Sequence, residues 1–403
     1  MKPRLLYLTH RVPFPPDKGD RIRNFHVLRT VATIARVTLV SLADEPVNGE
    51  SLSKLTELCD AVEIVPSGRN RRWLRAGRSL LTGRSLSEGL FAEPAFDATL
   101  AKLSGATPWD ASLVSASSLT PYQHRHGLPS KPRFVDLVDV DSQKWFDYAE
   151  AARGPKHALY TLEGHRVRKL EREIADWANA TFIVSPAECE VFDGFTRAGA
   201  GTVATNGVDL EYFRPQPDVP TRPICAFVGG LDYFPNIDGA IWFATEIWPA
   251  IRTRHPEAEF HIIGRKPTPA VLRLNAIGGV RVIADVPDVR PHLAGAALAV
   301  CPIRVARGLQ NKVLEAMAMA KPTLAAPAAI RAIRAEVGRD VLSPTTEAEW
   351  VAAVCDLLPD PVRQRELGAA ARQFVEAHHH WDRCLEPLVN AILAATNPQV
   401  PAR

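Results

Sequence analysis

Short apolar runs rich in β-branched residues alternate along the chain with longer segments of helical periodicity. This alternation is typical of parallel sheets covered by helices on both faces, because each crossover between parallel strands needs a long connection. The predicted fold class is therefore α/β with doubly wound sheets. The clearest helical stripes lie at 21–35 and 166–179. In the first half of the chain, the runs predicted to be strands are 4–9, 37–42, 62–65, 111–115, 133–138 and 180–184.

One segment, 206–223, interrupts this alternation. It contains four prolines and little periodicity, as expected of a connection between domains. A chain of 403 residues is also long for a single core. After the interruption, strands are predicted at 224–228, 259–263, 280–283, 298–301 and 323–325. We therefore predict two Rossmann-like domains facing each other across a cleft, with boundaries at 1–205 for the first domain, 206–223 for the connection, 224–380 for the second domain and 381–403 for a terminal helix and tail.

The charges of the chain nearly cancel. Forty-eight Lys and Arg against 45 Asp and Glu leave a net charge of +3, which argues against a surface built to wrap nucleic acid. No apolar run approaches the roughly 18 residues of a membrane-spanning helix, and the apolar stretch 5–8 is too short for a signal peptide. We therefore expect a cytoplasmic protein. The six cysteines stand singly, so the sequence predicts neither disulfides nor a zinc site.

Several well-known catalytic and cofactor motifs do not occur in the sequence. There is no GxGxxG of dinucleotide sites and no GxxxxGK[ST] of P-loops. The GxSxG elbow of serine hydrolases and the HExxH of zinc peptidases are absent as well. Hydride transfer, P-loop chemistry and hydrolysis of these types therefore lose their main support.

The segment 301–327 has a composition suited to an anionic ligand. A predicted strand leads through a loop with Gly308 into a predicted helix that begins near Lys312. A helix N-terminus directs N–H groups at an anion, and Arg304 and Arg307 add positive charge. Glu315 is placed to bind ribose hydroxyls, as acidic residues do in nucleotide sites. The alternative for Glu315, an exposed helix glutamate without a ligand, is equally compatible with its position.

Three stretches resemble a known family. NKVLEAMAMAKPTLA at 311–325 is similar to the donor-site helix of the family 4 retaining glycosyltransferases of GT-B fold. NGVDLEYFRP at 206–215 resembles that family's interdomain segment, and DVPDVRPHLAGAALAVCP resembles the strand-helix-strand before its donor loop. THRVPFPPDKGDRIRNF, VDVDSQKW and ARGLQNKVLEAMAM further resemble the sugar transferases associated with exopolysaccharide clusters of the PEP-CTERM/EpsH type. Together these stretches sample both predicted domains.

The resemblance implies that the second domain binds a nucleotide-diphosphate sugar as co-substrate, with no further cofactor and no metal. The first domain would bind the acceptor, a glycan or a polyprenyl-linked glycan. The donor-binding residues that follow are Gly229, Gly230, Arg265, Arg304, Gly308, Gln310, Asn311, Lys312 and Glu315. The candidate catalytic residues are Asp139, Asp141 and Arg307. The candidate acceptor-binding residues are Gly19, Asp20 and Arg23.

The sequence also departs from this family's pattern. The first glutamate of its E-x7-E motif is replaced by Arg307. Relatives carry an Arg and a Lys shortly after the first strand of the second domain, and 228–236 contains neither. We therefore expect Arg265, Arg304, Arg307 and Lys312 to share the neutralisation of the diphosphate. Ala320 stands where relatives have glycine, and we expect only a small packing change there.

Asp139, Val140 and Asp141 spell DxD, the metal motif of GT-A glycosyltransferases. In that alternative a Mn²⁺ ion would bridge the donor diphosphate. The motif is short, however, and it follows a strand of the first domain, away from the predicted donor loop. We therefore expect Asp139 and Asp141 to bind acceptor hydroxyls or to support acid/base chemistry.

The loop after the first strand is the predicted acceptor side. Gly19 would let backbone approach a sugar or phosphate, and Asp20 suits either a helix N-cap or a substrate contact. Arg23, one turn into the helix, is either an acceptor contact or a surface charge. Glu163 and His165 are weaker candidates, because charged helix residues are usually solvated.

The segment 67–87 breaks the overall neutrality. It contains arginines, Trp73 and several leucines but no acidic residue, a composition typical of a segment on an anionic membrane surface. A solvated or substrate-facing helix and a nucleic-acid patch are the alternatives, the last without a recognisable module. The residues predicted to contact the inner face of the cell membrane peripherally are Arg69, Arg71, Arg72, Trp73, Arg75 and Arg78.

Three functions are compatible with these observations. The first is a GT-B glycosyltransferase, retaining and metal-independent, that acts in exopolysaccharide biosynthesis. The second is a nucleotide-sugar-binding relative without transferase activity, which the Arg307 replacement and the missing Arg/Lys pair favour. The third is a metal-dependent transferase that uses Asp139 and Asp141.

Overall fold

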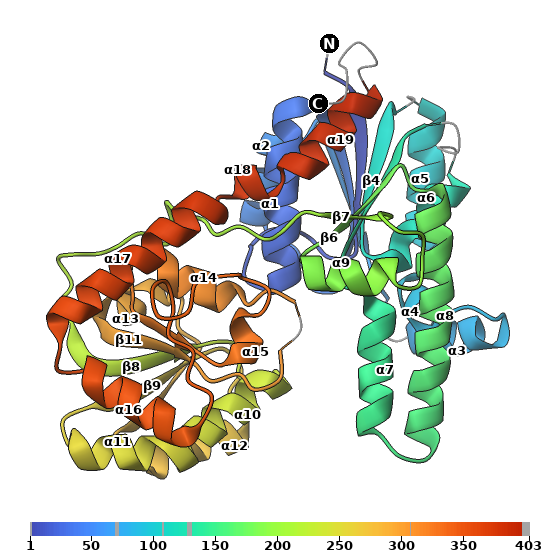
Figure 1. Cartoon of the computed structure of the whole chain (residues 1–403). Helices are drawn as coiled ribbons and strands as arrows, with labels where there is room; N and C mark the ends of the chain where they lie inside the picture. The colour runs from blue at the N-terminus through green and yellow to red at the C-terminus, as the bar shows by residue number, and fades with distance from the viewer. Residues whose placement is uncertain (1, 69–71, 107–108, 127–130, 307, 397–403) are drawn as a thin grey trace. The chain divides into compact units, whose positions relative to one another are not determined.

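The computed structural model describes residues 2–68, 72–106, 109–126, 131–306 and 308–396, and these form two compact units. The N-terminal unit consists of residues up to Thr205 together with the chain from Leu385 onward. The C-terminal unit is Asn206–Cys384 (Figure 1). The segment 206–223 therefore belongs to the C-terminal unit, and the last helix returns to the N-terminal unit.

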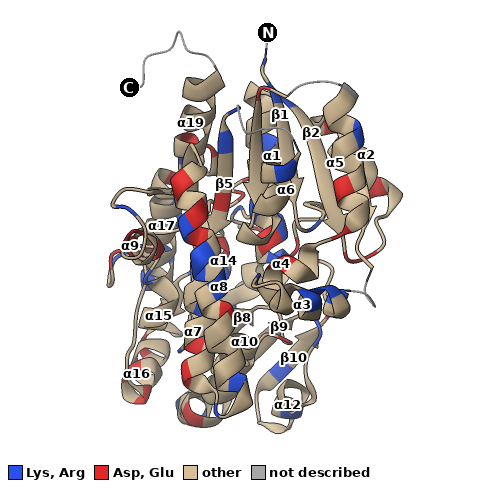
Figure 2. Cartoon of the chain, turned by 90° about the vertical axis from the view of Figure 1, so that its right-hand side faces the viewer, with Lys and Arg blue, Asp and Glu red and all other residues tan. Residues whose placement is uncertain are grey.

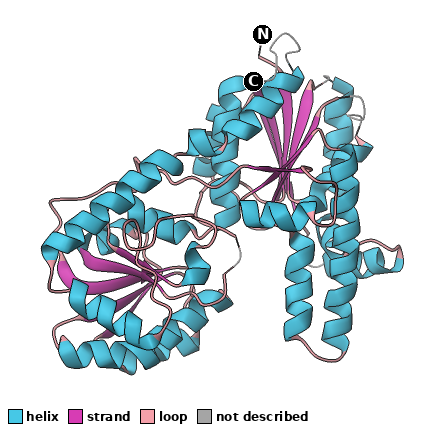
Figure 3. Ribbon diagram, in the orientation of Figure 1, coloured by secondary structure: helices cyan, strands magenta, loops and turns pink. Residues whose placement is uncertain are grey.

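The N-terminal unit is built on a seven-stranded parallel sheet with the order β3-β2-β1-β4-β5-β6-β7 (Figure 3). Its central strands are almost completely buried, which explains their continuous apolar runs. All six predicted strands are present, and β7, only three residues long, was not predicted. The strands are β1 Arg4–Thr9, β2 Arg36–Ala43, β3 Ala61–Pro66, β4 Ala111–Ser115, β5 Arg133–Val138, β6 Ala180–Ile183 and β7 Gly201–Val203.

Helices cover both faces of this sheet (Figure 1). α7 and α8 pair as an antiparallel hairpin that extends beyond the sheet (Figures 1 and 3). α8 begins at Pro155, eleven residues before the predicted start at 166. The helices are α1 Gly19–Ile34, α2 Gly49–Leu58, α3 Arg72–Leu81, α4 Leu86–Phe91, α5 Pro94–Ala106, the 3-10 turn η1 Ser117–Leu119, α6 Thr120–Arg125, α7 Asp141–Ala151, α8 Pro155–Trp177, α9 Pro186–Asp193 and α19 Glu386–Thr396.

The C-terminal unit has a five-stranded parallel sheet with the order β10-β9-β8-β11-β12. The strands are β8 Arg222–Val228, β9 Glu259–Gly264, β10 Val280–Ala284, β11 Ala296–Cys301 and β12 Thr323–Ala325. The helices are α10 Phe234–Trp242, the π-helix η2 Phe243–Ile247, α11 Trp248–Arg254, α12 Pro269–Leu272, the 3-10 turn η3 Arg273–Ala276, α13 Arg290–Gly295, α14 Asn311–Ala318, α15 Pro327–Ile330, α16 Glu347–Leu357, α17 Pro361–His378 and α18 Trp381–Cys384. All five predicted strands are present. Parallel β8, β9 and β11 therefore end at the same edge of the sheet.

The end of α14 shows why relatives have glycine at the position of Ala320. Ala320 has φ +54°, in the left-handed region. Lys321 N–H donates to the carbonyl of Ala316 at 3.1 Å, and Ala320 N–H donates to that of Met317 at 2.9 Å. These bonds form a Schellman motif, whose left-handed residue is usually glycine. The replacement of glycine by Ala320 thus affects the backbone conformation. The expectation of a small packing change at this position is wrong.

We predict that Ala320→Gly raises the free energy of unfolding by about 1 kcal/mol, because glycine adopts the left-handed conformation without the steric cost of a Cβ. Urea denaturation measures the change. Ala369→Gly is the matched control, since Ala369 is exposed within α17. There the same chemical change should lower stability by about 1 kcal/mol. A loss of stability in both variants would contradict the proposed strain at Ala320.

Candidate functional site

The predicted donor residues gather at the carboxyl edge of the C-terminal sheet. β8 is followed by Gly229 and Gly230, its neighbour β9 by Arg265, and its other neighbour β11 by the loop that leads into α14. Open parallel sheets bind ligands at this edge. The three stretches that the sequence singled out are therefore contributed by three adjacent strands.

Gly229 lies where two strand ends approach closely. Its N–H donates to the carbonyl of Ile263 at 3.0 Å. A Cβ on Gly264 would lie only 1.7 Å from the carbonyl oxygen of Gly229, and a Cβ on Gly229 would lie 2.9 Å from Nδ2 of Asn236. Glycine at 229 and 264 is therefore required by packing within the protein, whether or not a phosphate also approaches.

Lys312 is the centre of a polar network at this edge. Its Nζ donates to Oδ1 of Asn236 at 2.6 Å, and Nδ2 of Asn236 donates to the carbonyl of Gly230 at 2.7 Å. Burial lowers the pKa of Lys312, and the neighbouring Cys301 and Glu315 oppose that effect. The network joins the loop after β8 to the first turn of α14. Asn236 is buried and was missed by the sequence reasoning, although it ends the stretch 228–236 that lacks the expected cations.

Glu315, one turn after Lys312, is half-buried, so it is not the exposed helix glutamate of the alternative interpretation. Burial raises its pKa to about 7, against the opposing charge of Lys312. Within the described residues, its carboxylate accepts no hydrogen bond. An ionised carboxylate accepts hydrogen bonds from hydroxyl groups at both oxygens and more strongly than the protonated form, so any such binding should strengthen as the pH rises through about 7.

The other predicted donor residues have different surroundings. Arg304 pairs with Asp238 through two bonds of 2.7 and 3.1 Å, and its guanidinium lies 5.2 Å from the ring centre of Trp242. Its charge is thus already compensated by Asp238. Arg265 is exposed after β9, and its carbonyl accepts from Leu231 N–H at 2.8 Å. Arg307 lies outside the described residues.

The turn before α14 is shaped by Gly308 and Gln310. Gly308 has φ +61°, a conformation that favours glycine. Gln310 is the N-cap residue of α14, but its side chain makes no capping bond. Oδ1 of Asn311, the first helical residue, accepts from Nδ2 of Asn206 at 3.2 Å. Asn311 therefore ties the start of α14 to the segment that precedes β8.

In the N-terminal unit, the loop after β1 carries an ion-pair cluster around Asp20. Nη1 of Arg11 lies 2.8 Å from the Asp20 carboxylate and Nε2 of His10 lies 3.3 Å from it. Burial opposes ionisation of Asp20, but the hydrogen bonds and charges of His10 and Arg11 hold its pKa well below the usual range. The N-cap of α1 is Lys18, so the N-cap role predicted for Asp20 is wrong. A Cβ on Gly19 would meet no atom within 4 Å, so space is open there.

Arg23 forms a buried ion pair and contacts neither solvent nor an open site. Its Nε and Nη2 each lie 2.8 Å from the carboxylate of Asp136 on β5. Arg23 is 1% exposed and Asp136 is fully buried. Both predicted roles of Arg23, acceptor contact and surface charge, are therefore wrong. The side chain fixes α1 to the centre of the sheet.

Asp139 and Asp141 follow β5 at the carboxyl edge of the N-terminal sheet. Val138 has φ +67°, and Asp139 N–H donates across it to the carbonyl of Leu137 at 2.9 Å, which makes a strained γ-turn. Burial and the charges of Glu188 and Asp141 raise the pKa of Asp139 to about 7. One oxygen of Asp139 has no hydrogen-bond partner among the described residues. That oxygen is enclosed by the protein.

Asp141 begins α7 beside residues that the sequence did not single out. Its carboxylate accepts from Oγ of Ser117 at 3.2 Å, and burial raises its pKa against the opposing charges of Lys144 and His10. Ser117 follows β4, and His10 follows β1 within the THRVPFPPDKG stretch. In the part of the chain that the structure describes, no three His, Cys, Asp or Glu side chains are arranged to hold a metal ion.

Glu171 of α8 lies close to this carboxylate group. Ser142 N–H donates to its Oε1 at 3.1 Å, and burial raises its pKa from 4.5 to about 8. Because the pKa is raised on folding, the stability linked to the protonated form is complete below about pH 4.5 and is lost as the pH rises through about 8.

We therefore predict that Glu171→Gln has little effect on stability at pH 5 but raises the free energy of unfolding by about 2 kcal/mol at pH 8.5, because the amide stays neutral. Urea denaturation at the two pH values tests this expectation. Glu173→Gln, at an exposed position of α8, is the control and should behave alike at both pH values. An equal effect of Glu171→Gln at pH 5 and pH 8.5 would contradict the raised pKa.

The two weaker candidates on α8 have structural roles. Glu163 is fully buried and accepts from Leu86 N–H at 2.6 Å and from the N–H and Oγ of Ser87, each at 2.8 Å. It thus holds the first turn of α4. His165 packs its ring against Phe146, with ring centres 5.1 Å apart. Glu163 is therefore not the solvated group that was expected, whereas His165 is exposed, as expected of a charged helix residue.

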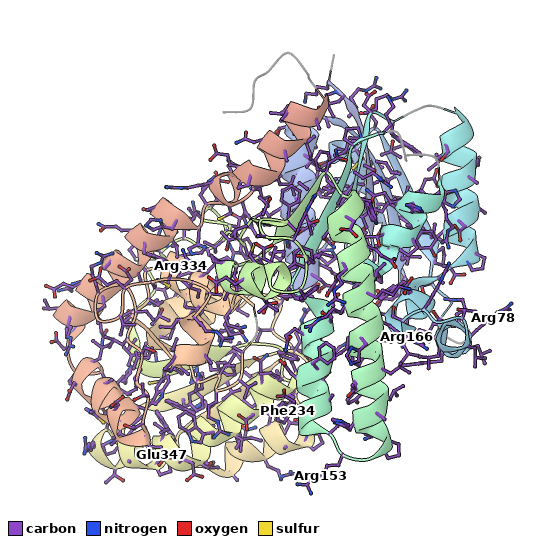
Figure 4. The ribbon with its side chains drawn as sticks, turned by 45° about the vertical axis from the view of Figure 1, so that its right-hand side comes forward. Arg78, Arg153, Arg166, Phe234, Arg334 and Glu347 are labelled. Carbon is purple, nitrogen blue, oxygen red and sulfur yellow. The ribbon has the colours of Figure 1, made fainter. Side chains whose placement is uncertain are left out.

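The basic segment forms α3, a helix with one covered and one open face. Ala76 and Ser79 pack against Gly89 of α4, whose added Cβ would lie 2.6 Å from each. On the open face, Trp73 is 63%, Leu74 75% and Leu81 89% exposed. Basic residues are concentrated along α3 (Figure 2), and the side chain of Arg78 points away from the unit (Figure 4).

Not all of the predicted basic residues are available on this face. Arg75 is paired with Glu93 at 2.8 Å, so it faces the protein. Arg72 places its guanidinium 5.8 Å from the ring of Trp73. Arg69 and Arg71 lie outside the described residues. Among the described residues, no helix is long and apolar enough to cross a membrane.

Comparison with known proteins identifies the class of the C-terminal unit. Residues 222–360 match the family described as Glycosyl transferases group 1. The C-terminal unit therefore carries a glycosyltransferase group 1 domain. No curated protein sequence matches the chain.

Solved structures match the chain over nearly its full length. The sucrose-phosphate synthase of Thermosynechococcus elongatus has 16% identity and a TM-score of 0.71, with 98% of this chain and 100% of that chain covered. HepE from Anabaena, in complex with UDP and glucose, has 12% identity and a TM-score of 0.69, with coverages of 97% and 100%. TarM of S. aureus has 10% identity and a TM-score of 0.69, with coverages of 97% and 99%. The fold is thus that of the GT-B glycosyltransferases, and together with the family match it supports a transferase.

Proposed function

We propose that the protein transfers a sugar from a nucleotide-diphosphate donor to a glycan or lipid-linked acceptor. We further propose that the transfer retains the anomeric configuration, needs no metal ion and serves exopolysaccharide biosynthesis, as the resemblance to family 4 enzymes of PEP-CTERM/EpsH-type clusters implies. The observation that carries the proposal is the Lys312–Asn236–Gly230 network beside Glu315, inside the matched domain. HepE, of similar fold, is known in complex with UDP-glucose.

Charge balance supports this assignment of the donor side. A nucleoside diphosphate leaves with about two negative charges, which a site must neutralise. Lys312 supplies a partly buried cation, Arg265 an exposed one, and the N-terminus of α14 adds its N–H groups and dipole. Glu315 would accept hydrogen bonds from the ribose hydroxyls. The diphosphate would leave from the same face of the donor sugar that the acceptor hydroxyl attacks. The configuration is then retained without a protein nucleophile.

The acceptor side would be the carboxyl edge of the N-terminal sheet. Asp139 and Asp141 combine raised pKa values with a carboxylate oxygen that lacks a partner among the described residues. Such groups can accept a hydrogen bond from a sugar hydroxyl and receive its proton. His10 and Ser117 lie beside Asp141 and would orient the same hydroxyl.

The decisive experiment measures donor binding and sugar transfer separately. A thermal-shift screen of nucleotide sugars identifies the donor, because a bound ligand raises the unfolding temperature according to its affinity. Transfer of the radiolabelled sugar to a membrane fraction is then followed with and without EDTA. Transfer that survives EDTA supports the proposal.

The two alternatives give different results. Tight donor binding without transfer would support a binding protein, the alternative favoured by Arg307 in place of glutamate and by the missing Arg/Lys pair. Transfer that stops with EDTA and returns with Mn²⁺ would support the metal-dependent alternative. Absence of nucleotide-sugar binding would refute all three.

Contact with the inner face of the cell membrane is the second part of the proposal. The open face of α3 combines Trp73, Leu74 and Leu81 with Arg78, the composition of a helix that lies in an anionic interface. Burial of two large apolar side chains contributes about 3 kcal/mol or more, and each arginine near the surface about 1 kcal/mol.

We predict that the double variant Trp73→Ser, Leu74→Ser binds phosphatidylglycerol vesicles about a hundredfold more weakly than the wild type in a flotation assay. The change removes apolar area without altering charge. Leu272→Ser, at a half-exposed leucine of the C-terminal unit, serves as the control. Equal vesicle binding by the wild type and the double variant would refute membrane contact through α3.

A further inference from the structure

An aromatic cluster lies on the α7–α8 hairpin, outside the buried core of the N-terminal unit. The ring of Trp145 lies 5.5 Å from that of Tyr160 and 5.9 Å from that of Tyr148, and the two tyrosine rings are 6.1 Å apart. Tyr148 is 43% exposed, and Trp145 and Tyr160 are half-buried. Three amphipathic rings therefore share one partly open patch between α7 and α8.

This patch continues from the carboxylate group at the sheet edge. Asp141, Trp145 and Tyr148 have the spacing i, i+4 and i+7, so they lie on one face of α7. Asp141 is the first residue of that helix and meets Ser117 at the carboxyl edge. From Asp141 to Tyr148 the helix rises about 10 Å. The partly buried Asp141 and the aromatic rings of Trp145 and Tyr148 thus follow one another along one face of α7.

The hairpin itself is held together by other side chains. Phe146 packs against Gly164, where an added Cβ would lie 2.8 Å from the ring, and Arg168 places its guanidinium 4.5 Å from the same ring. The N–H of Ser142 on α7 donates a hydrogen bond to Oε1 of Glu171 on α8 at 3.1 Å. Phe146 and Ser142 lie about 100° from Trp145 and Asp141 around α7. Tyr160 of α8 also contacts Trp145 and Tyr148 of α7, so the rings contribute to the pairing of the helices, but this pairing leaves Tyr148 43% exposed.

We propose that this face of the hairpin binds the sugar rings of the acceptor glycan, an inference that rests on the proposed transferase function. Flat aromatic faces suit the apolar C–H faces of pyranose rings, while the indole N–H and phenol O–H suit their hydroxyl groups. The carboxylates of Asp139 and Asp141, at the start of this face of α7, accept hydrogen bonds from the hydroxyl groups of the terminal sugar of the acceptor. Each ring on the patch carries a polar group, which favours a glycan over a polyprenyl chain as occupant.

The experiment uses the full-length protein and a panel of soluble hexasaccharides of glucose, galactose and mannose, with binding measured by calorimetry. UDP binding is measured on each sample as an independent check of the C-terminal unit. The variants are Trp145→Ala, Tyr148→Ala and Tyr148→Phe, with Leu159→Ala as the matched control, because Leu159 is a 39% exposed apolar residue of the same hairpin.

We expect the two alanine variants to bind the preferred hexasaccharide about tenfold more weakly, Tyr148→Phe to show a smaller loss because it keeps the ring without the hydroxyl, and Leu159→Ala to bind like the wild type. UDP affinity should be the same in all variants. Tyr148→Ala keeps the test valid should Trp145→Ala fail to fold, because Tyr148 is largely solvent-exposed.

Other results would overturn the inference. A protein that binds UDP but no hexasaccharide, or one whose hexasaccharide affinity is unchanged in folded Trp145→Ala and Tyr148→Ala, would exclude this glycan surface. The protein could instead bind polyprenyl phosphate in detergent micelles and no hexasaccharide. If the alanine variants then lost the lipid binding, the face would be assigned to lipid. Failure to bind UDP, with hexasaccharide binding that still depends on Trp145, would refute the proposed transferase but not the glycan surface.

Discussion

Replacing Arg23 by alanine is expected to lower the free energy of unfolding by about 3–5 kcal/mol, because the fully buried carboxylate of Asp136 would lose its only strong charge partner among the described residues. Both ions of this pair are removed from water, and two bonds of 2.8 Å compensate for that cost. Removal of one partner leaves a buried charge in a medium that solvates it poorly.

Urea denaturation of the single variant, of Asp136→Leu and of the double variant Arg23→Met, Asp136→Leu separates these contributions. The double variant should recover most of the lost stability, because no buried charge remains. Arg36→Ala is the matched control: Arg36 pairs with Asp60 at 2.6 Å, but both are exposed, so a change of less than about 1 kcal/mol is expected. A similarly small effect of Arg23→Ala would contradict the role of the buried pair.

Replacing Lys312 by methionine is expected to weaken UDP binding about 30-fold or more, since loss of one partner of a desolvated charge pair costs about 2–5 kcal/mol. Methionine keeps an apolar side chain of similar length but removes the ammonium group, its bond to Asn236 and its cation–π contact with Phe227. The diphosphate would then lose a cation, and the loop at Gly230 would lose its connection to α14.

Isothermal titration of UDP at one fixed salt concentration measures this effect. Lys321→Met is the control, because Lys321 donates to the carbonyls of Ala294 and Ala296 after the far end of α14. That variant should lose stability but keep its UDP affinity. Asn236→Ala should show an intermediate loss, because Lys312 remains but is no longer oriented. Unchanged UDP affinity in Lys312→Met would remove this residue from the proposed donor site.

Much of the sheet architecture could be predicted from the sequence. The predicted strands 4–9, 111–115 and 133–138 coincide with β1, β4 and β5, because buried parallel strands need continuous apolar runs that polar helices cannot imitate. Short β7 lacks such a run. The early start of α8 was also missed, because the hairpin extends beyond the sheet and its first turns need no regular apolar stripe.

The candidate site was predicted less completely than the fold. The sequence placed Lys312 and Glu315 in the first turns of one helix, since that depends on local spacing. It did not indicate that Asn236 orients Lys312, because those residues are 76 positions apart. Arg304 was expected to share the neutralisation of the diphosphate, and the sequence did not indicate that Asp238 of α10 compensates its charge.

The sequence by itself determined two parallel α/β sheets, the strand ends that carry the candidate donor residues and the basic character of α3. These properties follow from periodicity and composition, which act between neighbours in the chain. Only the tertiary structure decided that Arg23 is buried against Asp136, 113 residues away, that Glu163 holds α4, and that Trp145, Tyr148 and Tyr160 meet on one face. Charge pairing and desolvation depend on distances in space, and sequence spacing does not specify those distances.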